Sequence, residues 1–306
     1  MEQTNANYNL ATECTLCPRN CHADRLHGKF GYCGQGWEIK AARAALHMWE
    51  EPCISGESGS GTVFFSGCPL RCVFCQNHNI AIGKAGAVIT KERLVEIFFE
   101  LKEQGANNIN LVTPTHFIPQ IREALATANK KGLNIPIVYN TGSYENVDSL
   151  KMLEGFVDIY LPDFKYWDKN IAKRYANAED YRIHASAAIE EMVRQTGEPV
   201  FDEASGLMKK GVIVRHLVLP GYVEDSKKII RYLYETYGNR IYISIMNQFT
   251  PVGDMGGYPE LTRTLTREEY DQVVDYAIDL GVENGFIQEE GTASESFIPE
   301  FDLQGI

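Results

Sequence analysis

The sequence is short of positive charge and has no long apolar run. Its 29 lysines and arginines stand against 41 aspartates and glutamates, which gives a net charge of −12. Nucleic acids and anionic membranes bind positive fields, so this balance excludes a general affinity for either. No stretch approaches the roughly 18 consecutive apolar residues of a membrane-spanning helix. Residues 1–7 are polar and acidic, unlike a signal peptide, and we expect a cytoplasmic protein.

Cysteine is absent from residues 76–306, although the first 75 residues contain all eight cysteines. In a reducing compartment we do not expect disulfides, and metal binding or catalysis is the commoner use of such cysteines. This distribution predicts metal chemistry in the N-terminal quarter and a scaffold with a substrate surface in the rest. The 306 residues are 44% apolar and 23% charged, which is typical of a globular chain and excludes a disordered or fibrous one.

Strand-like and helix-like segments alternate from Thr62 onward. Strands are predicted at 62–66, 109–112, 135–139, 157–161, 212–219, 241–246 and 286–288. Helices are predicted at 90–101, 118–131, 226–237 and 266–280. A capping box, Thr266 with Glu269, begins the last helix. The alternation predicts a parallel sheet with right-handed crossovers, in a complete or partial barrel. A glycine-rich joint separates this barrel, 62–306, from a cysteine-rich extension, 1–55.

Three cysteines directly follow the first predicted strand in a C-x3-C-x2-C motif, Cys68, Cys72 and Cys75. Such a loop lets three thiolates converge on one centre, one fewer than a closed zinc site or a fully ligated [4Fe–4S] cube needs. A cube held at three corners leaves one iron open for a substrate or cofactor. The alternatives are a zinc site completed by His78 or Cys53, or plain core cysteines.

This motif resembles that of the radical S-adenosylmethionine (radical SAM) superfamily. It is most similar to the activating enzymes of glycyl radical enzymes, in the branch that resembles pyruvate formate-lyase activating enzyme. The likeness runs through 14–21 (CTLCPRNC), 66–77 (SGCPLRCVFCQN), 161–165 (LPDFK) and 215–221 (RHLVLPG). It implies an α/β fold, namely a partial (βα)6 TIM-type barrel with an N-terminal cysteine-rich metal-binding extension.

The resemblance also implies a cofactor set and a reaction. Cys68, Cys72 and Cys75 would ligate a [4Fe–4S] cluster whose open iron binds S-adenosyl-L-methionine (SAM). One electron, from a flavodoxin- or ferredoxin-type reductant, would cleave SAM to methionine and a 5′-deoxyadenosyl radical that abstracts a hydrogen atom. The protein's part is to orient the cofactor and exclude water.

Polar residues after the second and third barrel strands are the first candidates for SAM contacts. Thr113, Thr115 and His116 stand where the family carries a Gly-Gly-Glu turn for the SAM amino group, and this sequence lacks that turn. Hydroxyls and backbone carbonyls there can accept hydrogen bonds from an ammonium. A capping or core role fits His116 equally. Asn140 resembles a family turn near the SAM ribose or carboxylate, with an ordinary turn as the alternative.

Charged residues at the later strand ends complete the predicted SAM site. Alternation sends Asp163 and Lys165 to the same side, where burial requires a mutual ion pair or a ligand. In the family a matching pair lies by SAM and the substrate peptide. The planar guanidinium of Arg215 suits the SAM carboxylate, and pairing with Asp163 or Glu203 is the alternative.

Two positions near the last strands are weaker candidates. The activating enzymes carry a histidine after the sixth strand, where this chain has Asn247 and Gln248. We expect one of these amides, with Gln248 preferred, to substitute for it at SAM. The run at 288–290 is interpreted as solvated charge.

A second cysteine group occupies the extension, with the spacing C-x2-C-x3-C-x11-C: Cys14, Cys17, Cys21 and Cys33. Four thiolates close either a tetrahedral zinc site or an auxiliary [4Fe–4S] cluster, and the spacing does not separate the two. Four unliganded thiols are the remaining alternative. No catalytic opening is implied there. The remaining cysteine, Cys53, is interpreted as a plain thiol.

Three functions fit these features. The resemblance implies an activase that abstracts hydrogen from a backbone glycine of a partner glycyl radical enzyme, because a glycine Cα radical is exposed and stabilised by both flanking peptides. The alternative keeps the radical chemistry and takes another peptide or a small molecule. The third is a non-catalytic iron–sulfur or zinc protein, which has no use for a large barrel or an open iron.

Overall fold

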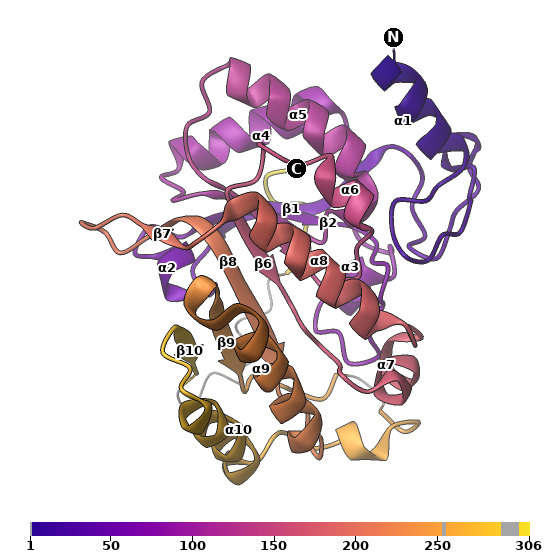
Figure 1. The fold of residues 1–306 in the computed structure, drawn as a ribbon. Coiled ribbons are helices and arrows are strands. Elements are labelled where there is room, and N and C mark those ends of the chain that lie inside the picture. Colours follow the sequence, from indigo (N-terminus) through magenta and orange to yellow (C-terminus); the bar gives the residue numbers. More distant parts are fainter. Residues whose placement is uncertain (1, 253–254, 289–299) are drawn as a thin grey trace.

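The computed structural model describes residues 2–252, 255–288 and 300–306, and its centre is one open, mostly parallel sheet (Figure 1). The order across the sheet is β10-β9-β8-β6-β5-β4-β2-β1-β3, and the short β7 pairs with β8. The strands are β1 (Ile39–His47), β2 (Ser60–Phe65), β3 (Ala87–Ile89), β4 (Ile109–Val112), β5 (Ile137–Thr141), β6 (Ile159–Pro162), β7 (Val200–Phe201), β8 (Met208–Leu217), β9 (Tyr242–Met246) and β10 (Gly285–Ile287).

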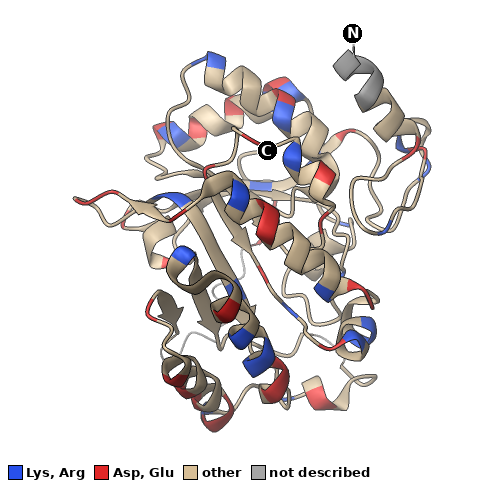
Figure 2. Cartoon of the chain, in the orientation of Figure 1, with Lys and Arg blue, Asp and Glu red and all other residues tan. Residues whose placement is uncertain are grey.

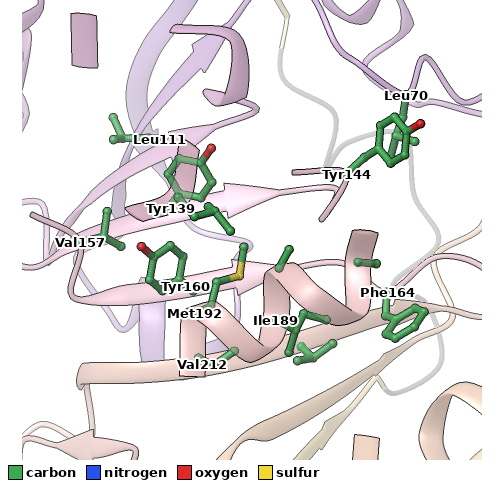
Figure 3. Close-up of a cluster of buried hydrophobic side chains, with 14 of the residues drawn as sticks. Leu70, Leu111, Tyr139, Tyr144, Val157, Tyr160, Phe164, Ile189, Met192 and Val212 are labelled. Atoms are coloured by element: carbon green, nitrogen blue, oxygen red, sulfur yellow. The ribbon is translucent and has the colours of Figure 1, made fainter. Parts of the chain in front are cut away.

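Helices surround this sheet, and longer ones that follow the parallel strands cover its outer face. The helices are α1 (Glu2–Thr12), α2 (Pro52–Ser55), α3 (His78–Ala81), α4 (Lys91–Glu103), α5 (Ile118–Lys130), α6 (Val147–Lys151), α7 (Lys169–Ala176), α8 (Tyr181–Thr196), α9 (Val223–Tyr237) and α10 (Arg267–Leu280). Helix α4 packs against β2 and β4, and α8 packs against β6 and β8. Ile189 and Met192 of α8 lie over Tyr160 and Val212 of the sheet (Figure 3).

The predicted parallel strands and the four predicted helices are confirmed, with shifts at their ends. The strand predicted at 135–139 begins at Ile137 because Pro136 has no N–H for the ladder. The capping box of α10 forms as predicted, since Thr266 and Glu269 bond each other's backbone N–H. The sheet stays open in the described residues, with β10 and β3 at its edges, so the barrel is partial.

Alternation along the strands divides the core into two layers. Tyr139, Tyr160 and Val212 face the helices. Val138, Leu161 and Ile213 face the concave side, where they pack with Cys53 and Ile54 of α2. Helix α2 therefore closes the floor of the barrel interior beneath the carboxyl ends of the strands.

The extension is joined to the barrel through the sheet itself. Strand β1 runs antiparallel beside β2, which the sequence analysis did not predict. The chain end also lies along β1, where the Ala44 N–H donates to the Gln304 carbonyl over 2.8 Å and the Leu303 N–H donates to the Ala42 carbonyl over 3.1 Å. The proposed division at 1–55 and 62–306 stays a prediction.

Charges of both signs alternate over the outer helices, and in the view of Figure 2 the lysines and arginines do not gather on one face. Within the described part of the chain, no helix combines the length and apolar character needed to cross a membrane.

Candidate active site

A cavity of about 250 Å³ opens at the carboxyl ends of the parallel strands. Nine of the residues predicted for the cluster or for SAM line it: Cys68, Cys72, Cys75, Thr113, Asn140, Asp163, Lys165, Arg215 and Gln248. They come from the loops after β2, β4, β6 and β9 and from β5 and β8 themselves. The strand ends thus gather residues that are up to 180 positions apart in the sequence.

The cysteine loop leaves β2 through Gly67, whose φ of +91° favours glycine. A Cβ atom at Gly67 would lie 2.5 Å from Gln35 Cγ and 2.8 Å from the Cys33 carbonyl oxygen. The absent side chain therefore lets the loop pack directly against the extension. Further along, the Val73 N–H donates to the Tyr175 carbonyl over 2.9 Å, which fixes the loop to α7.

The sulfur atoms of the loop accept hydrogen bonds. The Leu70 N–H donates to Cys68 Sγ over 3.4 Å, and the Tyr166 hydroxyl donates to Cys72 Sγ over 3.1 Å. Burial raises the pKa of Cys68 and Cys72, and it raises the pKa of Cys75 to about 12. Metal ligation displaces the thiol protons. Hydrogen-bond donors directed at the sulfur atoms then stabilise the resulting thiolates. The donor set fits a [4Fe–4S] cluster.

No group of three or more His, Cys, Asp or Glu side chains in the described ranges is arranged to hold a metal ion. A cube differs from a single ion because each thiolate binds its own iron, so the sulfurs stand apart. Of the two residues considered for a closed zinc site, His78 is exposed and Cys53 lies in the floor of the barrel. Neither lines the cavity.

Asp163 lies between two cations in the cavity wall. Its Oδ1 accepts from Arg215 Nε over 2.8 Å, and its Oδ2 accepts from Lys165 Nζ over 2.6 Å. Burial opposes the charged carboxylate, but Arg215 and Lys165 together hold the pKa of Asp163 below its ordinary value. The predicted ion pair is therefore present. Asp163, Lys165 and Arg215 also line the cavity, where a ligand can reach them.

A second carboxylate, Glu50, reaches the cavity from the segment between β1 and α2. Its Oε2 accepts from Arg215 Nη1 over 3.0 Å, and its Oε1 accepts from Asn110 Nδ2 and Asn140 Nδ2 over 3.1 and 3.2 Å. Arg215 Nη2 donates to Asn140 Oδ1 over 2.7 Å. Glu50 was not predicted, because nothing in the sequence shows that this segment folds into the barrel. Glu203, considered instead, is exposed in the turn between β7 and β8.

Thr115 and His116 lie behind the cavity and do not line it. Thr113 has a φ of +56°, and the chain then enters a short 3₁₀ helix that carries both residues into the protein. Thr115 Oγ1 donates to Glu145 Oε1 over 2.6 Å, and His116 Nε2 lies 2.7 Å from the Ser66 carbonyl oxygen. Burial, with Arg25 nearby, lowers the pKa of His116 to about 3, so its ring is neutral.

Gln248 lies at the mouth of the cavity, and its carbonyl accepts from Gln76 Nε2 over 3.1 Å. Its Oε1 accepts from Gln288 Nε2 over 3.4 Å. Residues 289 and 290 of the run interpreted as solvated charge lie outside the described residues. Trp49 lines this mouth as well and is 64% exposed, a contact surface that the sequence analysis did not select.

Comparisons with known proteins agree with this arrangement. A family model described as "Radical SAM superfamily" matches residues 62–233. The uncharacterized protein MJ0674 of Methanocaldococcus jannaschii is 28% identical over 279 residues, which cover 88% of this chain and 75% of that protein.

Two solved structures have a similar fold. SuiB of Streptococcus suis, bound to S-adenosylmethionine, is 14% identical with a TM-score of 0.50, over 75% of this chain and 52% of SuiB. The FeFe-hydrogenase maturase HydG of Carboxydothermus hydrogenoformans is 10% identical with a TM-score of 0.51, over 78% of this chain and 56% of HydG. The chain spans about half the length of both, and the likeness shows the fold alone. Because the family model covers more than half of the sequence, the chain belongs to the radical SAM superfamily.

Proposed function

We propose that this enzyme cleaves SAM reductively in the cavity at the strand ends and abstracts a hydrogen atom from a polypeptide. Membership of the superfamily implies a [4Fe–4S] cluster and SAM. When bound, the two supply a 5′-deoxyadenosyl radical as the hydrogen-abstracting agent. The observation that carries the proposal is that Cys68, Cys72 and Cys75 line one cavity together with Asp163 and Arg215.

The charges of the cavity suit the zwitterionic end of SAM. Arg215 and Lys165 offer cations to a carboxylate, and Asp163 and Glu50 offer anions to an ammonium. The four are linked in one hydrogen-bonded series, from Lys165 through Asp163 and Arg215 to Glu50, so their side chains are held before the ligand arrives. We propose that SAM exchanges some of these contacts for its own, with the ribose near Asn140.

Apolar side chains line another part of the cavity. They are Phe64, Leu70, Phe74, Val112, Leu217 and Phe249. A hydrogen-abstracting radical reacts with whatever is near, so a dry, shaped wall protects it from side reactions.

We propose a glycyl residue of a partner protein as the hydrogen donor. The support is the resemblance of 161–165 and 215–221 to glycyl radical activases, together with the shape of the site. A second cavity, lined by Trp49, Pro52 and Ile287, shares Arg215 and Gln248 with the first, which gives an extended opening that suits a chain. SuiB, of similar fold, was solved with its precursor peptide SuiA. A different peptide or a small molecule is the alternative substrate.

A redox partner, a reducing compartment and a second metal centre complete the proposed function. A flavodoxin- or ferredoxin-type protein would supply the electron. The eight free cysteines suit a reducing, cytoplasmic compartment. Cys14, Cys17, Cys21 and Cys33 would hold a second metal centre, zinc or [4Fe–4S].

The direct test is anaerobic reconstitution with iron and sulfide, followed by a chemical reductant and SAM. We expect formation of 5′-deoxyadenosine and methionine, and its loss in Cys72→Ala. Cys53→Ala is the matched control, since Cys53 is a buried cysteine outside the cavity, and we expect it to retain turnover. Turnover that survives in Cys72→Ala contradicts the cluster assignment.

The substrate is tested separately by electron paramagnetic resonance (EPR). Incubation with a candidate glycyl radical enzyme should produce a glycyl doublet, and deuterium at that glycine should appear in 5′-deoxyadenosine. Deuterium transfer from another peptide without the doublet would favour the alternative substrate.

A further inference from the structure

The buried guanidinium of Arg25 faces a cysteine sulfur and no carboxylate. Arg25 is 2% exposed. Its Nη1 donates to Cys14 Sγ over 3.7 Å and to the His116 carbonyl over 2.7 Å. Its Nε donates to the Gln35 and Gly36 carbonyls over 3.2 and 3.1 Å, and its Nη2 donates to Gly36 over 2.6 Å. All of its described acceptors are therefore backbone carbonyls and one thiol.

A buried negative charge nearby would stabilise a permanent cation in such a place, beyond its carbonyl acceptors and the rings of Trp37 and Phe117. Arginine cannot lose its proton in a protein, and burying an uncompensated charge is expensive. Neutral thiols do not supply that charge. Four thiolates around a [4Fe–4S] core do, as would four around one zinc ion, because either complex carries a net charge of about −2.

The segment around Arg25 is built around its cysteines. Between α1 and β1 the only regular element in the described chain is a three-residue 3₁₀ helix, Arg25–His27. Besides Arg25 and Gln35, its buried side chains are Leu16, Pro18 and three of the four cysteines, Cys14, Cys17 and Cys33. Such a small irregular unit lacks the apolar core that would hold it together, and natural proteins of this kind use metals or disulfides instead.

The four cysteines come from opposite ends of this segment. Cys14, Cys17 and Cys33 are close enough for their charges to interact. Cys21 packs against Gly31, where a Cβ atom would lie 2.3 Å from Cys21 Sγ. The glycine thus leaves room for the sulfur beside the turn that leads to Cys33.

We propose that Cys14, Cys17, Cys21 and Cys33 hold a second [4Fe–4S] cluster and that Arg25 is the positioning residue that balances its charge. The inference deepens the second metal centre of the proposed function. The thiols are not arranged around one ion position, and a cube accepts this because each corner binds one thiolate. Cluster binding releases the four thiol protons.

The same contacts connect the second cluster to the catalytic loop. Arg25 holds the carbonyl of His116, and the His116 ring bonds the carbonyl of Ser66, two residues before Cys68. An empty second site would leave Arg25 without its counter-charge. Loss of the second cluster is therefore expected to loosen the start of the loop and to lower SAM cleavage.

The test uses a full-length variant in which Cys68, Cys72 and Cys75 are all alanine. After anaerobic reconstitution we expect about four irons and four sulfides per chain, against about eight of each in the parent. One zinc per chain, or no bound metal, overturns the proposal. Neither result depends on SAM turnover, so failure of the proposed function and failure of this inference are distinguishable.

Arg25 is tested in the same triple variant by redox titration. Removal of a positive charge beside a cluster disfavours the reduced state, so Arg25→Gln should lower the midpoint potential at unchanged iron content. Arg25→Lys should stay near the parent, and Arg43→Gln, a change at an arginine paired with Asp302 outside the segment, is the matched control. An unchanged potential in Arg25→Gln overturns the role given to Arg25. If Arg25→Gln fails to fold, Arg25→Met, a neutral side chain of similar length, takes its place in the same titration, and the same fall in midpoint potential is expected.

Discussion

The Tyr166 hydroxyl donates a hydrogen bond to Cys72 Sγ over 3.1 Å, and both side chains are buried. This bond links the cysteine loop to the segment after β6, which also carries Asp163 and Lys165. A donor aimed at a ligand sulfur stabilises added negative charge, so it favours the reduced form of a cluster.

Tyr166→Phe should therefore lower the midpoint potential of the catalytic cluster without loss of iron. A neutral hydrogen bond contributes about 1 kcal/mol, which corresponds to a shift of about 40 mV for one electron. EPR-monitored redox titration measures the shift. Tyr160→Phe is the matched control, because Tyr160 donates to Gln195 away from the cavity. An equal shift in both variants would show that the hydrogen bond from Tyr166 to Cys72 does not set the midpoint potential.

Asp163→Asn should destabilise the fold even without cofactors. The change leaves Arg215 and Lys165 in a partly buried wall without the carboxylate between them, and removal of one member of such a group costs about 2–4 kcal/mol. Urea unfolding of the metal-free protein measures the loss. Asp302→Asn breaks an exposed pair with Arg43 and should cost less than about 1 kcal/mol. Similar losses in the two variants would contradict the prediction.

Local pattern was enough to predict the barrel units. Val212 and Ile213 face opposite layers of the core, as strand alternation requires, and the Thr266 capping box begins α10 as the sequence indicates. The cysteine loop after β2 was predicted in the same way, because its spacing and its strand lie together in the sequence.

Contacts between distant segments could not be predicted from local sequence pattern. Glu50 enters the cavity because β1 pairs with β2 and α2 closes the barrel floor, neither of which leaves a periodic signal. Thr115 and His116 turn away from the cavity because Thr113 adopts a positive φ, which is rare for threonine and has no sequence signature. The roles of the individual cavity residues toward SAM stay predictions.

The buried carboxyl of Glu145 should make the fold less stable as the pH rises. Burial raises the pKa of Glu145 from 4.5 to about 7, although Thr115, Thr141 and Tyr139 donate to it. The folded chain therefore holds this proton more tightly than the unfolded chain, so the free energy of unfolding falls between these two pH values. The full rise in the pKa of Glu145 corresponds to a loss of about 3 kcal/mol in the free energy of unfolding.

Glu145→Gln should remove this part of the pH dependence. Urea unfolding at about pH 5 and about pH 8 measures it, as the difference between the parent and the variant. Glu123→Gln, a change at a half-exposed carboxylate of α5 that pairs with Lys91, should leave the pH difference as it is. A parent and a Glu145→Gln variant with parallel pH profiles would show that Glu145 is ionised in the folded protein.

Arg19 fastens the cysteine loop to the extension and to α7. Its Nε donates to the Pro69 carbonyl over 2.8 Å, and its Nη2 donates to the Ala176 carbonyl over 2.7 Å. A further bond joins Nη1 to the Asn177 carbonyl, and the guanidinium lies 3.8 Å from the ring centroid of Tyr32. These contacts use the planar fork of arginine, which lysine does not reproduce.

Arg19→Ala should therefore weaken retention of the catalytic cluster more than it weakens the fold. We expect iron to leave the catalytic site several-fold faster in the presence of a chelator, and Arg19→Lys to recover only part of the loss, because each lost hydrogen bond is worth about 1 kcal/mol. Arg263→Ala, which breaks a contact with Glu269 far from the loop, is the control. Unfolding in urea, measured in parallel, separates cluster retention from global stability. Equal release rates in Arg19→Ala and the parent would show that the Pro69 contact does not hold the loop.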